Sequence, residues 1–157
     1  MGAGYSSAAY ISYTAQVGVG LSGGFTTMCF IPDAVVQGTW GNQVNGSMTQ
    51  SAFYNPSAAN ADECTFTRYL SEGTYTCKIM YQSGTSRPIC FIKIDGVDVA
   101  SVDTYAGSDG GDLISNTTSI VVGTSGVKSI NLEVRGKNAS GSGYNANIQI
   151  LAFIRTA

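Results

Sequence analysis

The chain has 157 residues and a mass of 16.3 kDa, enough for one domain that buries about 68% of the surface its unfolded form exposes. Only 11% of the residues are charged, and 8 basic side chains stand against 10 acidic ones without forming runs. This balance leaves no basic face for phosphates, so it argues against nucleic acid as a partner and against a polybasic membrane anchor.

The amino-terminal segment 1–26 is rich in Gly, Ser, Ala and Tyr and keeps no sustained hydrophobic period. We predict that it forms an extended arm. The start of the chain lacks the cationic residues and continuous apolar block of a signal peptide, and no run approaches the length of a membrane-spanning helix. We therefore expect synthesis in a cytoplasm and no membrane partner.

Short β-prone pieces follow at 27–31 and 34–37, and a turn-rich stretch extends over 41–61. Its Asn-Gly and Asn-Pro pairs are turn formers. We expect mainly loops in this stretch, with one or two edge strands.

The region after residue 61 alternates apolar and polar residues in a way that predicts two hairpins. The first joins 62–70 to 74–82 through a Glu-Gly turn. The second joins 89–94 to 97–102 through an Asp-Gly pair, which supplies the positive φ angles of a type I′ turn.

An acidic, glycine-rich loop is expected at 105–112, and further strands at 113–122, 127–135 and 144–155. The last strand is apolar on both faces. One face carries Ile148, Ile150 and Ile154, and the other carries Leu151 and Phe153. Its outer face therefore needs a cover, which either the arm or a neighbouring copy of the chain supplies; the second option makes an oligomer.

The predicted strands number about eight, and no window keeps a helical period. This pattern predicts an all-β fold, an antiparallel β-sandwich of the jelly-roll kind. We divide the chain into the arm at 1–26 and the sandwich at 27–157.

Metal-binding and redox motifs are missing around the four cysteines, which are Cys29, Cys64, Cys77 and Cys90. No C-x-x-C spacing and no histidine occurs, so zinc-ribbon and zinc-finger sites are excluded. Alternation places Cys77 and Cys90 on inward faces, which favours free buried thiols. A disulfide between neighbouring strands is the alternative.

Catalytic motifs are also missing. Without histidine a Ser or Cys nucleophile has no ordinary base, and no G-x-S-x-G elbow occurs. Asp62 and Glu63 are adjacent on a predicted strand and so point to opposite faces. The G-x-G-x-x-G match at 18–23 lacks the strand and helix that a dinucleotide site needs. We expect no enzyme activity and no cofactor.

Five aspartates in and beside the acidic loop are candidate calcium ligands. They are Asp95, Asp98, Asp103, Asp109 and Asp112. Their spacing matches no known calcium loop, so solvated turn carboxylates are the default interpretation and no metal site is assigned.

Aromatic residues give the more serious candidates for a ligand site, and the chain offers Trp40, Tyr69, Tyr81, Tyr105 and Tyr144. Trp40, Tyr105 and Tyr144 lie in predicted turns, where exposed rings can stack on the apolar faces of sugars. Tyr81 shares a register with inward residues and is expected in the core. Packing at a subunit contact explains the three turn residues equally well.

Spaced turn motifs carry a family resemblance. They are Asp-Ala-Val-Val-Gln-Gly-Thr-Trp at 33–40, Glu-Gly-Thr-Tyr-Thr at 72–76, Ile-Asp-Gly-Val at 94–97, Asp-Thr-Tyr-Ala-Gly at 103–107 and Gly-Lys-Asn-Ala-Ser-Gly-Ser-Gly-Tyr at 136–144. In this order they resemble jelly-roll domains of tailed-bacteriophage virion proteins, which occur in head decoration (cement) proteins and fibre tips. The resemblance implies a homotrimer, which the doubly apolar last strand also favours. It supplies no ligand residues.

We therefore expect a non-enzymatic capsid decoration protein on the exterior of a virion, binding and stabilising the major capsid protein after synthesis in the host cytoplasm. A chain that begins at its own Met1 and forms one domain favours this over a fibre tip. The alternative is a receptor-binding fibre tip or carbohydrate-binding module that recognises host surface glycans.

Overall fold

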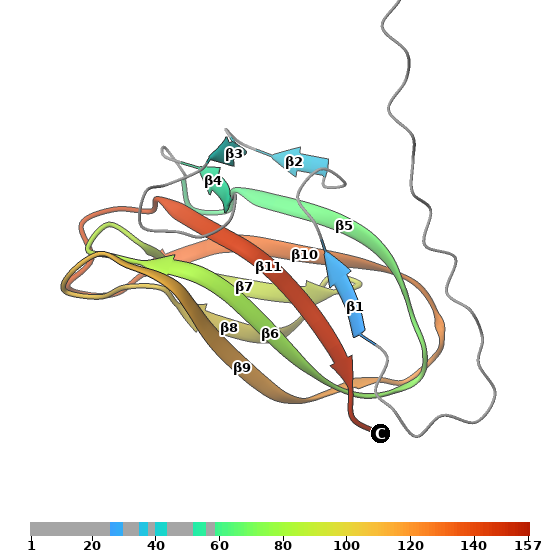
Figure 1. The fold of residues 1–157 in the computed structure, drawn as a ribbon. Coiled ribbons are helices and arrows are strands. Elements are labelled where there is room, and N and C mark those ends of the chain that lie inside the picture. The colour runs from blue at the N-terminus through green and yellow to red at the C-terminus, as the bar shows by residue number, and fades with distance from the viewer. Residues whose placement is uncertain (1–25, 30–34, 38–39, 44–51, 56–58) are drawn as a thin grey trace, which may run out of the picture.

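Antiparallel strands make up most of the described chain, which the computed structural model gives as residues 26–29, 35–37, 40–43, 52–55 and 59–157 (Figure 1). The predicted arm, apart from Thr26, lies outside these residues. The strands are β1 (Thr26–Cys29), β2 (Val35–Gln37), β3 (Gly41–Gln43), β4 (Ala52–Asn55), β5 (Glu63–Leu70), β6 (Gly73–Ser83), β7 (Pro88–Ile94), β8 (Val97–Asp103), β9 (Gly110–Val122), β10 (Gly126–Lys137) and β11 (Ala146–Arg155). In this part of the chain no helix is long and apolar enough to cross a membrane.

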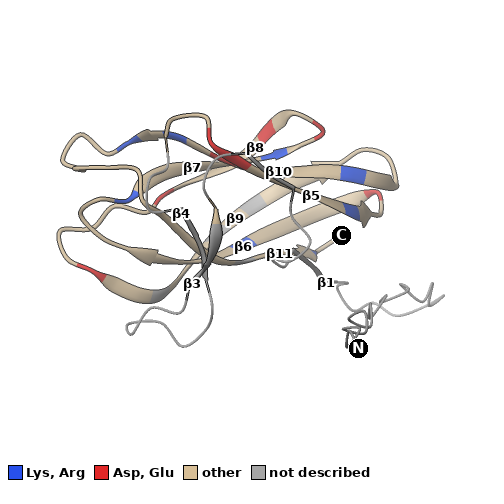
Figure 2. Cartoon of the chain, turned by 90° about the horizontal axis from the view of Figure 1, so that it is seen from above, with Lys and Arg blue, Asp and Glu red and all other residues tan. Residues whose placement is uncertain are grey.

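Two sheets stack face to face, as Figures 1 and 2 show. The six-stranded sheet has the order β3-β4-β11-β6-β9, with β1 pairing the free side of β11, and the five-stranded sheet has the order β2-β5-β10-β7-β8. Neighbouring strands run antiparallel throughout. The predicted antiparallel β-sandwich is therefore confirmed.

The turn-rich stretch contains two short strands, within the one or two that the sequence predicts. They are β3 and β4, which pair with each other, and β4 pairs in turn with β11, so β3 lies at an edge and β4 does not. Residues 44–51 and 56–58 lie outside the described residues. Both strands are only three or four residues long. Strand β4 pairs with the side of β11 that β6 leaves open, a partner more than 90 residues away that no local pattern reveals.

The first predicted hairpin is wrong, because β5 and β6 belong to different sheets. Leu70, at the end of β5, and Tyr75, near the start of β6, are both buried, so the chain turns a corner around the core. The connection from β9 to β10 crosses in the same way, and the amide of Glu72 donates to Ser125 Oγ at 2.8 Å to join the two corners. We call this the corner end of the sandwich.

The second predicted hairpin is confirmed. Asp95 and Gly96 connect β7 to β8 with φ angles of 51° and 81°, the left-handed pair of a type I′ turn. Asp95 also accepts the amide of Ser129 at 2.9 Å and lies 3.0 Å from the ammonium of Lys128. The Ser129 hydrogen bond, followed by the one from Lys128, holds the pKa of Asp95 below its usual value.

The core lies between the sheets and follows the period-two pattern of the sequence. Its members include Cys64, Phe66, Leu70, Tyr75, Cys77, Ile79, Cys90, Ile92, Ile94, Ile120, Ile130, Leu132, Ile148, Leu151 and Phe153. Among the described side chains, Cys64, Cys77 and Cys90 are buried and form no disulfide, and the inward facing predicted for Cys77 and Cys90 is confirmed, while the side chain of Cys29 lies outside the described residues. Burial, with a smaller contribution from the Asp103 carboxylate, raises the pKa of Cys90 to about 12.

Strand β11 departs from the predicted alternation at one point. A register shift between Ile148 and Ile150 moves Ile148 into the core with Leu151 and Phe153, although the sequence placed it on the opposite face. A β-bulge of this kind adds one residue and inverts the facing of what precedes it. On the outer side Ile154 is half-buried, and the side chain of Ile150 lies outside the described residues. The predicted cover over that face stays a prediction.

Candidate functional site

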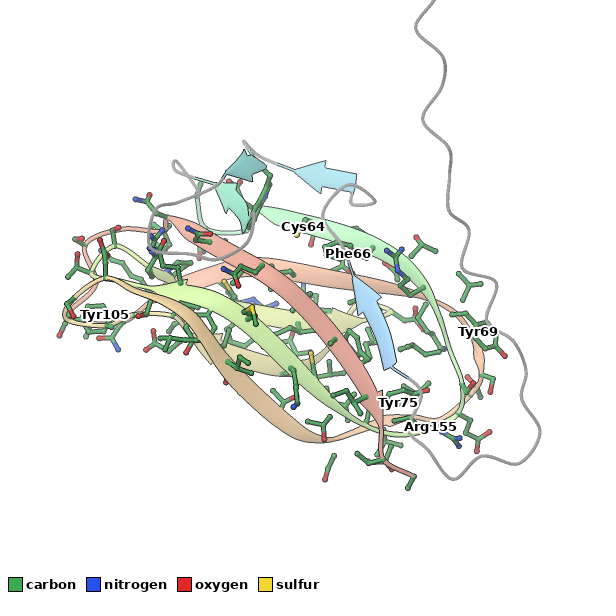
Figure 3. The ribbon with its side chains drawn as sticks, in the orientation of Figure 1. Cys64, Phe66, Tyr69, Tyr75, Tyr105 and Arg155 are labelled. Carbon is green, nitrogen blue, oxygen red and sulfur yellow. The ribbon has the colours of Figure 1, made fainter. Side chains whose placement is uncertain are left out.

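Three loops meet at the end of the sandwich opposite the corners, the end that Tyr105 marks in Figure 3. They are 84–87 between β6 and β7, 104–109 between β8 and β9, and 138–145 between β10 and β11. We call them the loop cluster. Each of these loops connects a strand of one sheet to a strand of the other, so the cluster draws residues from both layers.

Backbone hydrogen bonds tie these loops to one another. The amide of Ala106 donates to the carbonyl of Gly84 at 3.1 Å, and the amide of Ser142 donates to the carbonyl of Thr85 at 2.8 Å. Loop 84–87 therefore lies between the other two and bonds to each. Connections of this kind hold a loop surface in one conformation without a metal or a disulfide.

A buried polar layer supports the loop cluster from below. Arg87 is only 6% exposed; its guanidinium donates to Gln82 Oε1 at 2.7 Å and to the carbonyl of Asn145 at 3.1 Å. Asn147 donates to the same Gln82 oxygen at 2.7 Å. Since a buried cation is tolerated only when it is hydrogen-bonded, Arg87 requires Gln82 and Asn145 to stay in place. The layer thus fixes the spacing between 84–87 and 138–145.

Asp103 links the second and third loops. Its carboxylate accepts the backbone amide of Tyr105 at 3.0 Å and the side-chain amide of Asn138 at 2.7 Å. The pKa values of Tyr81 and Cys90 are raised, first by their burial and then by this carboxylate. The Asp103 carboxylate therefore holds two of the loops by hydrogen bonds and also raises the pKa values of two groups at and next to the core.

Trp40 and Tyr144 pack together with the small buried cluster of Val134 and Ala146. Trp40 also packs against the main core, so it acts as a bridge between core and loops. The Lys137 ammonium lies 5.7 Å from the centre of the Tyr144 ring, within the range of a cation–π contact. All three predicted aromatic residues, including Tyr105, are half-buried and not fully exposed.

Tyr105 is held by its backbone, which pairs with Gly84 as an isolated parallel bridge. The exposed carboxylate of Asp109 lies against the same glycine, and a Cβ at Gly84 would clash with Asp109 Oδ1. Gly84 thus permits a close approach that a larger residue would block. Tyr81, predicted in the core, is half-buried and packs against it.

The five aspartates do not converge on one point. Asp95 and Asp98 have basic partners, Lys128 for the first and Arg135 for the second. The Asp112 side chain lies outside the described residues. Among those that are described, no three His, Cys, Asp or Glu side chains lie close enough to hold a metal ion.

A second polar surface covers the outer face of the five-stranded sheet. Glu133 pairs with Lys93 and with Arg135 at 2.7 Å, and Arg135 also donates to both carboxylate oxygens of Asp98, at 2.6 and 3.1 Å. The Arg135 guanidinium stacks 4.2 Å from the Phe91 ring centre. The Arg135 hydrogen bond is the main cause that lowers the pKa of Glu133 to about 2. These groups satisfy one another, which is typical of a structural network.

The sequence missed the polar layer. Arg87 stands between a turn and an apolar strand, where a solvated side chain is the default, and its partner Asn145 is 58 residues away. Only the pairing of the loops brings them together. Tyr69, another of the aromatic residues that the sequence offers for stacking, is 55% exposed but lies at the corner end, away from the loop cluster.

No protein-family model and no curated protein matches the chain. Among solved structures, the CBM36-1 domain of a multidomain xylanase from the hindgut metagenome of Trinervitermes trinervoides has a TM-score of 0.64 and 22% identity, covering 82% of this chain and 96% of that one. A CBM36 carbohydrate-binding module in complex with calcium and xylotriose has a TM-score of 0.58 and 18% identity, covering 81% and 98%. A family 35 carbohydrate-binding module from an environmental isolate has a TM-score of 0.56 and 20% identity, covering 78% and 89%.

At these identities the likeness shows the fold alone, a β-sandwich of the kind found in carbohydrate-binding modules. Nothing in these structures points to phage virion proteins, so the family resemblance of the turn motifs gains no support from them.

Proposed function

We propose that the chain is a non-catalytic carbohydrate-binding domain and that its loop cluster takes the glycan. The observation that carries the proposal is the fixed placement of Tyr105 and Tyr144 on loops that are tied to each other and to a buried polar layer. The fold shared with carbohydrate-binding modules supports it. This is the alternative that the sequence offered, and it takes precedence over capsid decoration.

The chemistry of the loop surface suits a sugar. Each half-buried tyrosine offers part of a ring face for stacking on the apolar side of a pyranose. The exposed carboxylate of Asp109 and the exposed hydroxyl of Ser140 can bond to sugar hydroxyls. Because the loops are already ordered by their own hydrogen bonds, little conformational entropy is lost on binding.

Capsid decoration has no comparable support from the described contacts. The homotrimer, the major capsid protein as partner and the location on a virion stay predictions. The division into an arm at 1–26 and a sandwich at 27–157 also stays a prediction.

A glycan array with the full chain, followed by calorimetry on the best saccharide, tests the proposal. Tyr105→Ala and Tyr144→Ala should each weaken binding by about tenfold, because a stacked ring contributes about 0.5–1.5 kcal/mol beyond the area that it buries. Circular dichroism should show an unchanged sandwich for both variants.

The matched control is Tyr69→Ala, which removes an exposed tyrosine from the corner end. Its affinity should equal that of the unchanged chain. A chain that binds no saccharide on the array, or a Tyr69 variant that loses as much affinity as the loop variants, would contradict the proposal.

A further inference from the structure

One sheet edge differs from every other edge in the described chain. Strand β9 has 13 residues and pairs only with β6 among the described strands, so its outer side is a long edge. Its pairing with β6 is regular over 113–117 and shifts register on either side of that stretch. The other edge strands are shorter: β1 has four residues, β2 and β3 have three each, and β8 has seven. Short edges offer few unpaired backbone groups, whereas β9 offers many.

The side chains of β9 also lack the usual protection. From 113 to 122 the strand contains no charged residue and no proline. The edge strand β8, by contrast, carries Asp98 and Asp103, and Figure 2 shows that most charged residues lie on the five-stranded sheet. Natural proteins place charges, prolines or bulges on edges to prevent them from pairing with another chain. Strand β9 shifts register on either side of 113–117 and has a positive φ at Ser119, but the regular stretch 113–117 carries none of these three features, which indicates an edge that is open to pairing.

Apolar side chains are exposed on β9 itself. Leu113 is 41% exposed, Ile114 54% and Val121 72%, and these are three of the six exposed large apolar residues in the described chain. Leu113 and Ile114 are consecutive, so they point to opposite faces of the sheet. A partner docked on one face covers only one of them, whereas an added strand brings side chains to both faces and covers the pair.

We infer that β9 pairs with β9 of a second copy of this chain, antiparallel about a two-fold axis, and so joins two six-stranded sheets edge to edge. The identical strand is the one edge in the described chain that matches β9 in length. Self-pairing brings no like charges together over 113–122, whereas two copies joined through β8 would bring Asp98 and Asp103 of each copy to one seam. A two-fold contact closes on itself and gives a dimer.

The inference is tested by sedimentation and light scattering on the full chain over a range of concentrations. The unchanged chain should be a dimer, and Ile114→Lys with Val121→Lys should weaken it by at least about tenfold, since each lysine enters the two-fold seam twice. Both sites are exposed, so the sandwich should keep its stability.

The control variant combines Val97→Lys with Val127→Lys, at valines that are 65% and 69% exposed on the other sheet. Its dimer affinity should be unchanged. A monomer at all concentrations, a trimer, or an equal loss in the control variant would overturn the inference.

Hydrogen exchange separates a second copy from the chain's own amino-terminal segment as the occupant of this edge. If two β9 strands pair, dilution should speed exchange at the amides of 113–117 and leave 1–25 unchanged. Exchange at 113–117 that does not depend on concentration would reject the pairing. Exchange there that changes together with that of 1–25 would also reject it and would assign the edge to residues 1–25.

Discussion

The connections at the two ends of the sandwich rest on different kinds of buried side chains, apolar at one end and polar at the other. At the corner end the chain turns over apolar side chains, with Leu70 and Tyr75 only 1% and 2% exposed. At the opposite end, which carries the loop cluster and which we call the loop end, the connections rest on Arg87, Gln82 and Asn147, which are buried but polar. Figure 3 shows the separation, with Tyr105 at one end and Tyr69, Tyr75 and Arg155 at the other.

The difference suits the corner end to stabilising the fold and the other end to holding the proposed glycan site in one conformation. Apolar burial is non-directional and stabilises in proportion to area, so it holds a corner without specifying where a particular side chain points. Hydrogen bonds to a buried guanidinium are directional, and they fix the loops relative to each other. A surface that must present rings and carboxylates in set positions needs the second kind of support.

The largest expected effect is at the corner end. Leu70→Ala should lower the free energy of unfolding by about 2–5 kcal/mol, because it leaves a cavity in the closed core. The protein that remains folded should bind glycan as before. Urea unfolding with calorimetry checks both results, and Tyr69→Ala, one residue away and exposed, should change stability far less. A Leu70 variant that lost glycan affinity would mean that the two ends are coupled.

The next effect is at the loop end, where we expect a smaller loss of stability and a loss of glycan affinity. Arg87→Ala removes the bonds to Gln82 and Asn145 and should cost about 1–3 kcal/mol in unfolding free energy. Glycan affinity should fall by more than that of any corner variant, and Arg87→Lys should restore it only in part, since an ammonium lacks the planar fork. Arg68→Ala, which removes an arginine near the corner end, serves as the control. Unchanged glycan affinity in the Arg87→Ala variant would mean that the polar layer does not contribute to binding.

The sequence predicted those features that depend on neighbours in the chain. The β7–β8 hairpin follows from Asp95-Gly96, whose φ angles only such a pair adopts easily, and the buried faces of β5, β6 and β10 follow from alternation. The pattern could not separate a hairpin from a corner, because Glu72-Gly73 permits both. The choice depends on which sheet the next strand joins.

The candidate site was predicted only in its aromatic residues. The sequence indicates Tyr105 and Tyr144 because rings in predicted turns can be exposed for stacking, but their common position depends on loops that are distant in the sequence. Asn138 reaches Asp103 over 35 residues, and Asn145 reaches Arg87 over 58. The bulge in β11 had no signal either, because the isoleucines at 148, 150 and 154 suit a regular strand as well.

Acid should destabilise the outer face of the five-stranded sheet through Glu133. Glu133 has its pKa lowered from 4.5 to about 2 in the folded protein, so its contribution to stability is complete above the unfolded pKa and is lost as pH falls through the folded one. Between about pH 5 and pH 2 the loss should amount to about 1–2 kcal/mol after screening at the partly exposed partners. Unfolding by urea across this range measures it. Glu133→Gln should flatten the slope, and Glu72→Gln, at an exposed corner residue, should not; equal slopes for both variants would contradict the assignment.

The smallest expected effect is on the free energy of unfolding when one glycine at each end is replaced by alanine. Gly96 has a φ of 81° in the type I′ turn at the corner end, and Ala there should cost about 1 kcal/mol, because a Cβ is unfavourable in the left-handed region. Gly107, in the loop cluster, is not among the glycines with positive φ, and a Cβ would meet no atom within 4 Å at either position. Gly107→Ala should therefore leave unfolding unchanged or slightly raise its free energy, since it restricts the unfolded chain. Thermal unfolding of both variants measures the two changes. A loss of stability confined to the Gly96 variant would assign it to backbone conformation. Equal losses would show that the loop end is as constrained as the turn.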